Sequence, residues 1–229
     1  MMRHIVLLMT LAVGLAGCGQ SQAVREERAI NSILKLGGEV KRDEKLPGRQ
    51  VVGVEFIGTK ITDADLKDLK ELKGLRWLDL SGTQITDAGL KELKEIKSLQ
   101  KLYLMSTKVT DAGLKILREL KEIDSLRLAG TAITDVGLKD LKQLKRLQYL
   151  EMAGTQITDT GLKDIKEIKG LWQLGLMGTK ITDAGVKELK EIKGLAHLDI
   201  RDTGITEAGV KELQEALPNV NLWGYPRGP

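Results

Sequence analysis

The chain has 229 residues, a hydrophobic fraction of 41%, an aromatic fraction of 3% and a formal charge of +4. This length allows one good-sized domain, and the scarcity of aromatic side chains leaves leucine, isoleucine and glycine to build its core. The single cysteine excludes a network of disulfide bonds within the chain.

The first residues have the pattern of an export signal. Arg3 precedes an apolar run from Ile5 to Ala16, and a basic end followed by a short apolar stretch is typical of such signals. The run is shorter than the roughly 20 apolar residues that a membrane-spanning helix needs. Residues 1–17 are therefore predicted to be removed, which takes away one positive charge and lowers the formal charge from +4 to +3.

The stretch Leu-Ala-Gly-Cys at 15–18 resembles the lipobox of bacterial lipoproteins. In that class the chain is cut before the cysteine, whose new N-terminus and thiol receive acyl chains. The resemblance implies a mature chain that begins at Cys18 and is held outside the cytoplasm by several acyl chains. Gly19 stands where an aspartate often retains lipoproteins in the inner membrane, which favours the outer membrane. The alternative is a plain secretory signal followed by a chance cysteine.

Residues 18–49 are expected to form a short tether and an N-terminal cap. Residues 23–38 predict an amphipathic helix that ends at glycine, with Ile30, Ile33 and Leu34 on one side. Residues 39–56 predict a hairpin whose turn lies near Pro47 and Gly48. Residues 218–229 predict a C-terminal cap with one last short strand.

Between these ends, seven copies of one 24-residue unit cover residues 50–217. A threonine marks the same position in every copy: Thr59, Thr83, Thr107, Thr131, Thr155, Thr179 and Thr203. Within the second copy, residues 75–80 (LRWLDL) end in the alternation of a strand, whereas residues 86–97 (TDAGLKELKEIK) have the spacing of an amphipathic helix. Thr86 is a suitable N-cap, and Asp87 suits a helix N-terminus. A unit this small cannot bury its apolar side alone, so the repeat predicts a solenoid of stacked copies.

The unit resembles the leucine-rich repeat, which reads L-x-x-L-x-L-x-x-N/C-x-L. Leu75, Leu78, Leu80 and Ile85 fill its apolar slots, and Thr83 takes the asparagine or cysteine slot. The stretch ITDAGL is also similar to repeats of planctomycete-type bacterial proteins and of eukaryotic F-box proteins, but no F-box-like segment precedes the first unit. The resemblance implies an α/β solenoid with a concave parallel sheet, convex helices, seven repeats and two caps. It also implies that the threonine hydroxyl makes part of the backbone hydrogen bonds of the family asparagine.

The outer surface of the expected helices carries rows of charge that alternate in sign. A lysine row lies beside rows of aspartate and glutamate: Lys67, Lys91, Lys115, Lys139, Lys163, Lys187 and Lys211. A nucleic-acid site would gather one sign on one face. The alternation instead predicts a solvated outer face and no nucleic-acid partner.

The concave strand positions vary from copy to copy, which makes them the candidate binding face. They hold the residue types that are enriched in protein interfaces. Neighbouring strands lie about 4.8 Å apart, so Trp77 and Tyr103 are expected to touch and Tyr149 to lie about 10 Å further on, with Trp223 a candidate fourth aromatic residue. The candidate binding residues are Trp77, Asp79, Lys101, Tyr103, Met105, Arg127, Tyr149, Glu151, Met177, His197, Asp199 and Arg201.

These patterns favour a binding module over an enzyme. His197 is the only histidine outside the predicted signal, and no serine stands at the matching positions beside it. His197 and Asp199 supply two metal ligands where a closed zinc site needs four, so a solvated His–Asp pair is expected, with no metal and no cofactor. The leading hypothesis is an exported, lipid-anchored protein of the bacterial cell envelope that binds a protein or peptide through its concave face. The alternatives are an envelope polysaccharide as partner, and a passive spacer whose inner aromatic residues have drifted.

Overall fold

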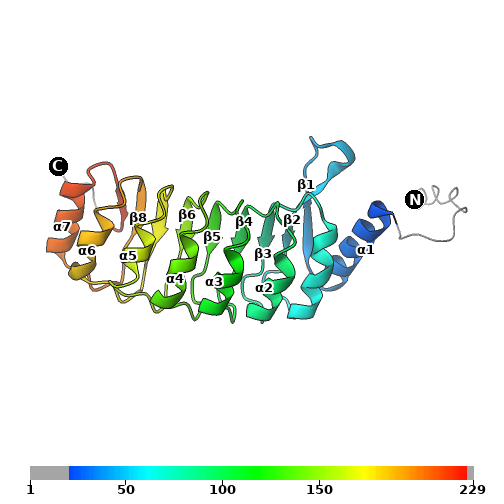
Figure 1. The fold of residues 1–229 in the computed structure, drawn as a ribbon, viewed down its shortest axis with the longest axis horizontal. Helices are drawn as coiled ribbons and strands as arrows, with labels where there is room; N and C mark the ends of the chain where they lie inside the picture. The colour runs from blue at the N-terminus through cyan, green and yellow to red at the C-terminus, as the bar shows by residue number, and fades with distance from the viewer. Residues whose placement is uncertain (1–20, 226–229) are drawn as a thin grey trace, which may run out of the picture.

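The computed structural model describes residues 21–225. The predicted signal, Cys18 and residues 226–229 lie outside this range. The described chain is an elongated stack of strand and helix units, which runs from α1 at the right of Figure 1 to α7 at the left. One continuous sheet forms one side of the stack, and helices form the other. No helix between residues 21 and 225 is both long and apolar enough to cross a bilayer.

Nine strands form the sheet in the order in which they occur along the chain. The first two pair in antiparallel orientation, and every later pair is parallel. In the parallel part each residue pairs with the residue 24 positions later, as Trp77 does with Lys101. The strands are β1 (Glu39–Arg42), β2 (Val51–Glu55), β3 (Trp77–Asp79), β4 (Lys101–Tyr103), β5 (Ser125–Arg127), β6 (Tyr149–Glu151), β7 (Gln173–Gly175), β8 (His197–Asp199) and β9 (Asn221–Trp223).

Each strand from β2 to β8 is followed by a helix on the outer side, and α1 precedes β1. The first repeat has a 3₁₀ helix, η2, where the later repeats have α-helices, and a short 3₁₀ turn, η1, closes the hairpin between β1 and β2. The helices are α1 (Gln22–Lys35), η1 (Pro47–Arg49), η2 (Asp63–Glu71), α2 (Asp87–Leu93), α3 (Asp111–Leu117), α4 (Asp135–Leu141), α5 (Leu162–Ile165), α6 (Asp183–Leu189) and α7 (Glu207–Ala216).

The core is a set of leucine and isoleucine columns between sheet and helices. The central strand residue of each unit is fully enclosed, as at Leu78 and Leu102, both 0% exposed. Burying such a side chain contributes about 1.5–3 kcal/mol, and each unit depends on its neighbours for that burial. At the N-terminal end α1 covers the stack with Ala29 and Ile33. Leu34, expected on the same side, is 53% exposed, because one residue further along a helix turns by about 100°.

The turn after each inner strand has a fixed backbone shape. Gly82 has a φ of +71°, in the left-handed region that glycine enters without strain. The neighbouring Thr83 hydroxyl donates to the Leu80 carbonyl oxygen at 2.6 Å. This is the expected bond to the backbone of the turn, and it forms within each of the other units, at Thr59, Thr107, Thr131, Thr155, Thr179 and Thr203.

Adjacent units are instead joined through an aspartate at or just before the helix of each of the first six units. Asp63 accepts the Thr86 backbone N–H at 2.9 Å and the Thr86 hydroxyl at 2.6 Å, while that hydroxyl caps the Ala88 N–H. Helix-terminal location alone was the expected explanation of these aspartates, and it is incomplete. We call the series the Asp–Thr ladder: Asp63–Thr86, Asp87–Thr110, Asp111–Thr134, Asp135–Thr158, Asp159–Thr182 and Asp183–Thr206.

The ladder also explains a glycine in the first turn of each helix. A Cβ at Gly89 would lie 2.5 Å from Asp63 Oδ1, which is closer than any relaxed contact. In the first unit the position that corresponds to Gly89 is Asp65. No preceding unit places a ladder aspartate against it, so a side chain fits there. The Asp65 carboxylate accepts the backbone N–H and the hydroxyl of Thr62 at 2.7 and 2.8 Å, which forms a capping box.

Candidate binding surface on the inner face of the sheet

The inner face is the side of the sheet turned away from the helices. Side chains alternate along a strand. The middle residue of each three-residue strand therefore points into the core between sheet and helices, and the two flanking residues lie on the inner face. In β3 this places Leu78 in the core and Trp77 on the inner face. The candidate residues on β3 to β8 therefore share one face, as the repeat predicts.

One group of rings lies near the N-terminal end of this face. The Trp77 and Tyr103 ring centroids are 6.2 Å apart in an edge-to-face arrangement, so the expected contact is present. The Arg127 guanidinium lies over the Tyr103 ring, 4.3 Å from its centroid, a cation–π geometry. Lys101 is exposed beside Trp77, and both line a small hollow of about 230 Å³.

A second group lies towards the C-terminal end. The ring of Trp172 is 5.4 Å from that of Tyr149 and 4.5 Å from that of His197, and Trp223 follows at 6.5 Å from His197. Tyr149, Trp172 and Trp223 are each 40% exposed. Trp172 is not among the binding residues predicted from the sequence, because it precedes β7 and lies outside the alternating strand positions. Its signal was available, since an exposed tryptophan there replaces polar residues such as Gln100 and Gln148 of the preceding units.

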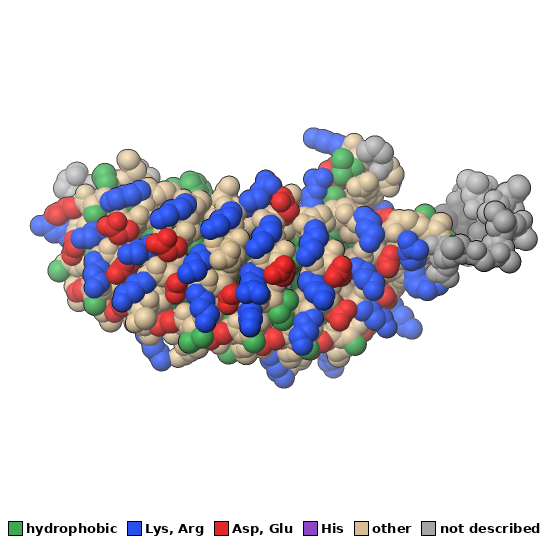
Figure 2. Space-filling model, viewed as in Figure 1, with side chains coloured by type: hydrophobic (Ala, Val, Ile, Leu, Met, Phe, Trp, Pro, Cys, Tyr) green, Lys and Arg blue, Asp and Glu red, His purple; other side chains and the backbone are tan. Residues whose placement is uncertain are grey.

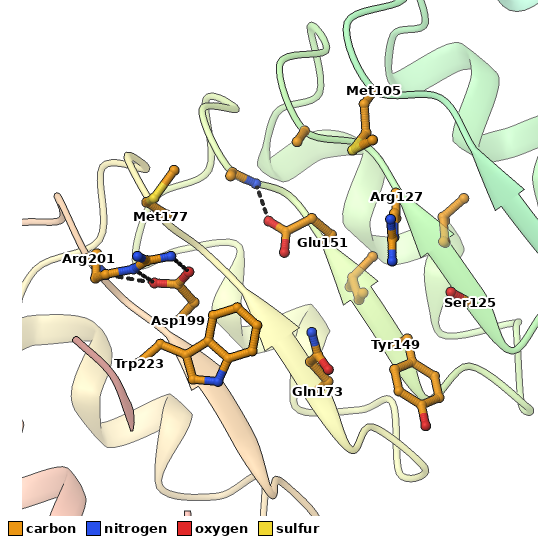
Figure 3. A pocket seen from close by; sticks show the side chains of 14 residues that line it. Met105, Ser125, Arg127, Tyr149, Glu151, Gln173, Met177, Asp199, Arg201 and Trp223 are labelled. Atoms are coloured by element: carbon orange, nitrogen blue, oxygen red, sulfur yellow. Dashed lines mark hydrogen bonds and ion pairs between the residues drawn. The ribbon is translucent and has the colours of Figure 1, made fainter. Parts of the chain in front are cut away.

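A hollow of about 490 Å³ lies on the same face, where Arg127 of the first group and Tyr149 and Trp223 of the second are among its lining residues (Figure 3). Met105 and Met177 border it on one side, and Tyr149 and Trp223 lie across from them. Its charged lining residues are Arg127, Glu151, Asp199 and Arg201. We call this feature the central hollow.

Glu151 is the half-buried carboxylate of the central hollow. Its Oε1 accepts the Ala153 backbone N–H at 3.0 Å. Its carboxylate lies over Gly175, where a Cβ would come within 2.0 Å of Oε2. Burial raises the pKa of Glu151, and the nearby charge of Asp199 adds to this, although the Ala153 N–H and the charge of Arg127 oppose it.

Asp199 was expected to form an open, solvated pair with His197, and this is wrong. Asp199 is only 8% exposed and binds Arg201, with Oδ1 2.9 Å from Nε and Oδ2 2.6 Å from an Nη. Burial by itself raises the pKa of Asp199, but the Arg201 hydrogen bonds outweigh it and hold that pKa below its usual value. Asp199 is thus part of a bidentate ion pair, and His197 packs between two tryptophan rings instead.

Asp79 also departs from the expected exposed position. It is 6% exposed, and its Oδ1 accepts the Ser81 backbone N–H at 2.9 Å. The short aspartate side chain folds onto the turn that follows β3, a local bond that aspartate commonly makes. Asp79 therefore offers little surface to a ligand.

The helix face has a different character, with lysine and arginine interspersed with acidic side chains over its whole visible surface (Figure 2). Ion pairs join successive units there, as between Lys166 and Glu188 at 2.6 Å. Within residues 21–225, no group of three or more histidine, cysteine, aspartate or glutamate side chains is arranged to hold a metal ion.

A family model described as leucine-rich repeat matches residues 75–94 and 145–166. No curated protein matches the chain in sequence. Among solved structures, the chain is similar to an internalin (InlF) of Listeria monocytogenes, with a TM-score of 0.58 and 21% identity over 72% of this chain and 45% of that one. It is similar to internalin C2 of the same organism, with a TM-score of 0.55 and 22% identity over 85% and 92% of the two chains. A leucine-rich-repeat protein of Leptospira interrogans matches with a TM-score of 0.50 and 19% identity over 68% and 44%.

The chain spans less than half of the InlF and Leptospira structures. At these identities the likeness establishes the fold, and it is the fold that the 24-residue repeat predicts.

Proposed function

We propose that this leucine-rich-repeat protein, an α/β solenoid, is an exported and lipid-anchored binding module of the bacterial cell envelope. Its inner face binds a protein or peptide, and it performs no catalysis. The acylated Cys18 is the anchor, and Gly19 after it favours the outer membrane. This assignment draws on the lipobox-like stretch at 15–18.

The observation that carries the binding proposal is the pairing of two aromatic groups with the central hollow on a single face. Tyr149, Trp172 and Trp223 remain 40% exposed although the chain has only three tryptophans and three tyrosines. Tryptophan, tyrosine and arginine are the side chains that dominate binding energy in interfaces. The helix face, by contrast, carries interspersed positive and negative charge (Figure 2).

An envelope polysaccharide is the second candidate, because exposed rings can stack on sugars. The ring pairs Tyr149–Trp172 and Trp172–His197 are each inclined at 60°, so the rings do not form one flat platform. Rings tilted in this way fit the irregular side chains of a peptide better than they fit a flat sugar chain. The two partners are separated by experiment.

The test is capture of a partner from envelope extract by the immobilised full chain, compared with the Trp77→Ala/Tyr103→Ala double variant. A second double variant, Trp172→Ala/Trp223→Ala, tests the other aromatic group. Val136→Ala serves as matched control, because Val136 is 64% exposed on α4 of the helix face. We expect the wild type and the Val136→Ala control to capture a partner protein that neither double variant captures.

Sedimentation with purified wall polysaccharide tests the second candidate with the same variants. If the wild type sediments and the aromatic variants do not, the partner is the glycan. A spacer would behave alike in every variant. Membrane fractionation of Cys18→Ser tests the anchor, which is refuted if that variant stays as firmly membrane-bound as the wild type.

A further inference from the structure

Two side chains of opposite charge occupy neighbouring strands of the central hollow without pairing. Arg127 of β5 and Glu151 of β6 are register partners in the sheet. Opposite charges at such positions usually stabilise a sheet by pairing. Here Arg127 turns back over the ring of Tyr103 on the preceding strand, and Glu151 turns forward over Gly175 on the following strand. Both side chains line the hollow, and they extend in opposite directions across the sheet (Figure 3).

The Glu151 carboxylate has unused capacity as an acceptor. One oxygen accepts the Ala153 N–H, and no side chain within residues 21–225 donates to the other. The absence of a Cβ at Gly175 leaves the space that this oxygen occupies. Burial already disfavours its charge, which raises its pKa. A cationic group entering the hollow would relieve that cost.

The Arg127 guanidinium has unused capacity as a donor. Its planar group carries five N–H donors, and in the part of the chain that the structure describes its contact is with the Tyr103 ring. Stacking on a ring leaves the N–H edge of a guanidinium free to bind a carboxylate in bidentate fashion. Arg201, in contrast, is already engaged by Asp199.

The central hollow, which both groups line, suits a short stretch of peptide. The central hollow has a volume of about 490 Å³, within the usual size range of binding sites. Met105 and Met177 on its border provide flexible apolar contact. Tyr149 and Trp223 provide rigid rings on the opposite side.

We propose that the central hollow binds a peptide segment that carries one basic and one acidic side chain, the basic group at Glu151 and the acidic group at Arg127. This inference rests on the proposed function and names the chemistry of its partner. A neutral glycan could hydrogen-bond to both groups through its hydroxyls but would neutralise neither charge, and burying a charge that is not neutralised is costly. A peptide of a single charge sign would pair one group and leave the other.

The test uses defined peptide pools on the immobilised full chain. The peptides are acetylated and amidated, so that only side chains carry charge, and two fixed positions are separated by randomised uncharged residues. The fixed pair is lysine with glutamate in both orders, two lysines, two glutamates, or two glutamines. We expect the mixed pool to be retained about two- to fivefold better than the glutamine pool for each charge paired.

The variants assign each charge to its residue. Glu151→Gln should remove the advantage of lysine and keep that of glutamate, and Arg127→Gln should do the reverse. Lys115→Gln and Glu95→Gln remove exposed charges from helix-face segments and should leave the preference unchanged. Far-ultraviolet circular dichroism confirms that each variant is folded.

Equal retention of the mixed and glutamine pools would overturn the charge pairing while leaving peptide binding intact, provided that Trp172→Ala/Trp223→Ala abolishes the retention. Retention of no pool would also overturn the inference. The proposed function is also refuted only if the wild type captures no protein from envelope extract that the aromatic double variants fail to capture. A preference that survives both charge variants would show that other residues select the peptide and would refute the assignment.

Discussion

The carboxylate of Asp111 binds both the backbone N–H and the hydroxyl of Thr134 in the next repeat, at 2.9 and 2.7 Å. The two residues are 23 positions apart, so this contact belongs to the junction between units and not to either helix alone. The threonine hydroxyl also accepts the Val136 N–H at 3.2 Å. One aspartate thus orders the start of the following helix.

Replacing Asp111 with alanine should lower the free energy of unfolding by about 2–3 kcal/mol. Each hydrogen bond to a charged group is worth about 1.5–3 kcal/mol, and the bonds of one side chain are not additive. Urea unfolding followed by circular dichroism measures the effect. Glu95→Ala removes an exposed acidic side chain and should stay within about 0.5 kcal/mol of the wild type. Equal midpoints for the two variants would contradict a structural role for the ladder.

Gly137→Ala should cost about 1–3 kcal/mol through overpacking. The added Cβ would lie 2.5 Å from Asp111 Oδ1 and 2.9 Å from a methyl carbon of Leu114. In the Asp111→Ala background the first clash is gone, so the penalty should fall, and a double-mutant cycle would report this as coupling. Strict additivity of the two changes would show that the glycine is required for another reason.

Glu151→Gln should stabilise the protein increasingly as the pH rises. The folded-state pKa of Glu151 lies above its ordinary value of 4.5, chiefly because of burial. The folded state therefore holds the proton more tightly than the unfolded state. The wild type loses stability as the pH rises from the Glu151 pKa of the unfolded state to that of the folded state. Glutamine has no such loss. Thermal midpoints recorded from acidic to neutral pH should diverge, whereas the pair of wild type and Glu95→Gln should stay parallel.

Gly175→Ala should displace Glu151 with little effect on stability. The new Cβ would come within 2.0 Å of Glu151 Oε2, the end of a flexible side chain that can rotate into solvent. We expect a change in unfolding free energy within about 1 kcal/mol and a Glu151 pKa that falls towards its ordinary value. Carbon-detected NMR titration of the glutamate carboxyls measures the shift. An unchanged pKa would mean that burial of Glu151 does not depend on this glycine.

The fold followed from the sequence because two periods recur in every unit. The spacing of Leu78 and Leu80 requires a strand, and the spacing of Leu90 and Leu93 requires a helix, so stacking is the only arrangement that buries both. The Asp–Thr ladder did not follow, because Asp87 after an N-cap already has a sufficient local explanation. A contact between units cannot be distinguished from that local role without coordinates.

The inner face was predictable in register but not in detail. Trp77 and Tyr103 meet because a 24-residue period places them on adjacent strands. Asp79 and Asp199 are hidden because a short carboxylate can bond to its own turn or to a neighbouring arginine. Trp172 lies before its strand, where alternation gives no guidance. Side-chain hydrogen bonds and strand ends decide these cases, and the alternation along a strand predicts neither.

Every junction in the Asp–Thr ladder uses the same parts, so Asp87–Thr110 and Asp159–Thr182 are interchangeable. A gene that duplicated or deleted one 24-residue segment would encode a protein whose new junction already has its aspartate, threonine and glycine. The inner face would lengthen or shorten by about 4.8 Å with each such event. Recombination can therefore change the reach of this surface in whole steps, without any further mutation to repair the join.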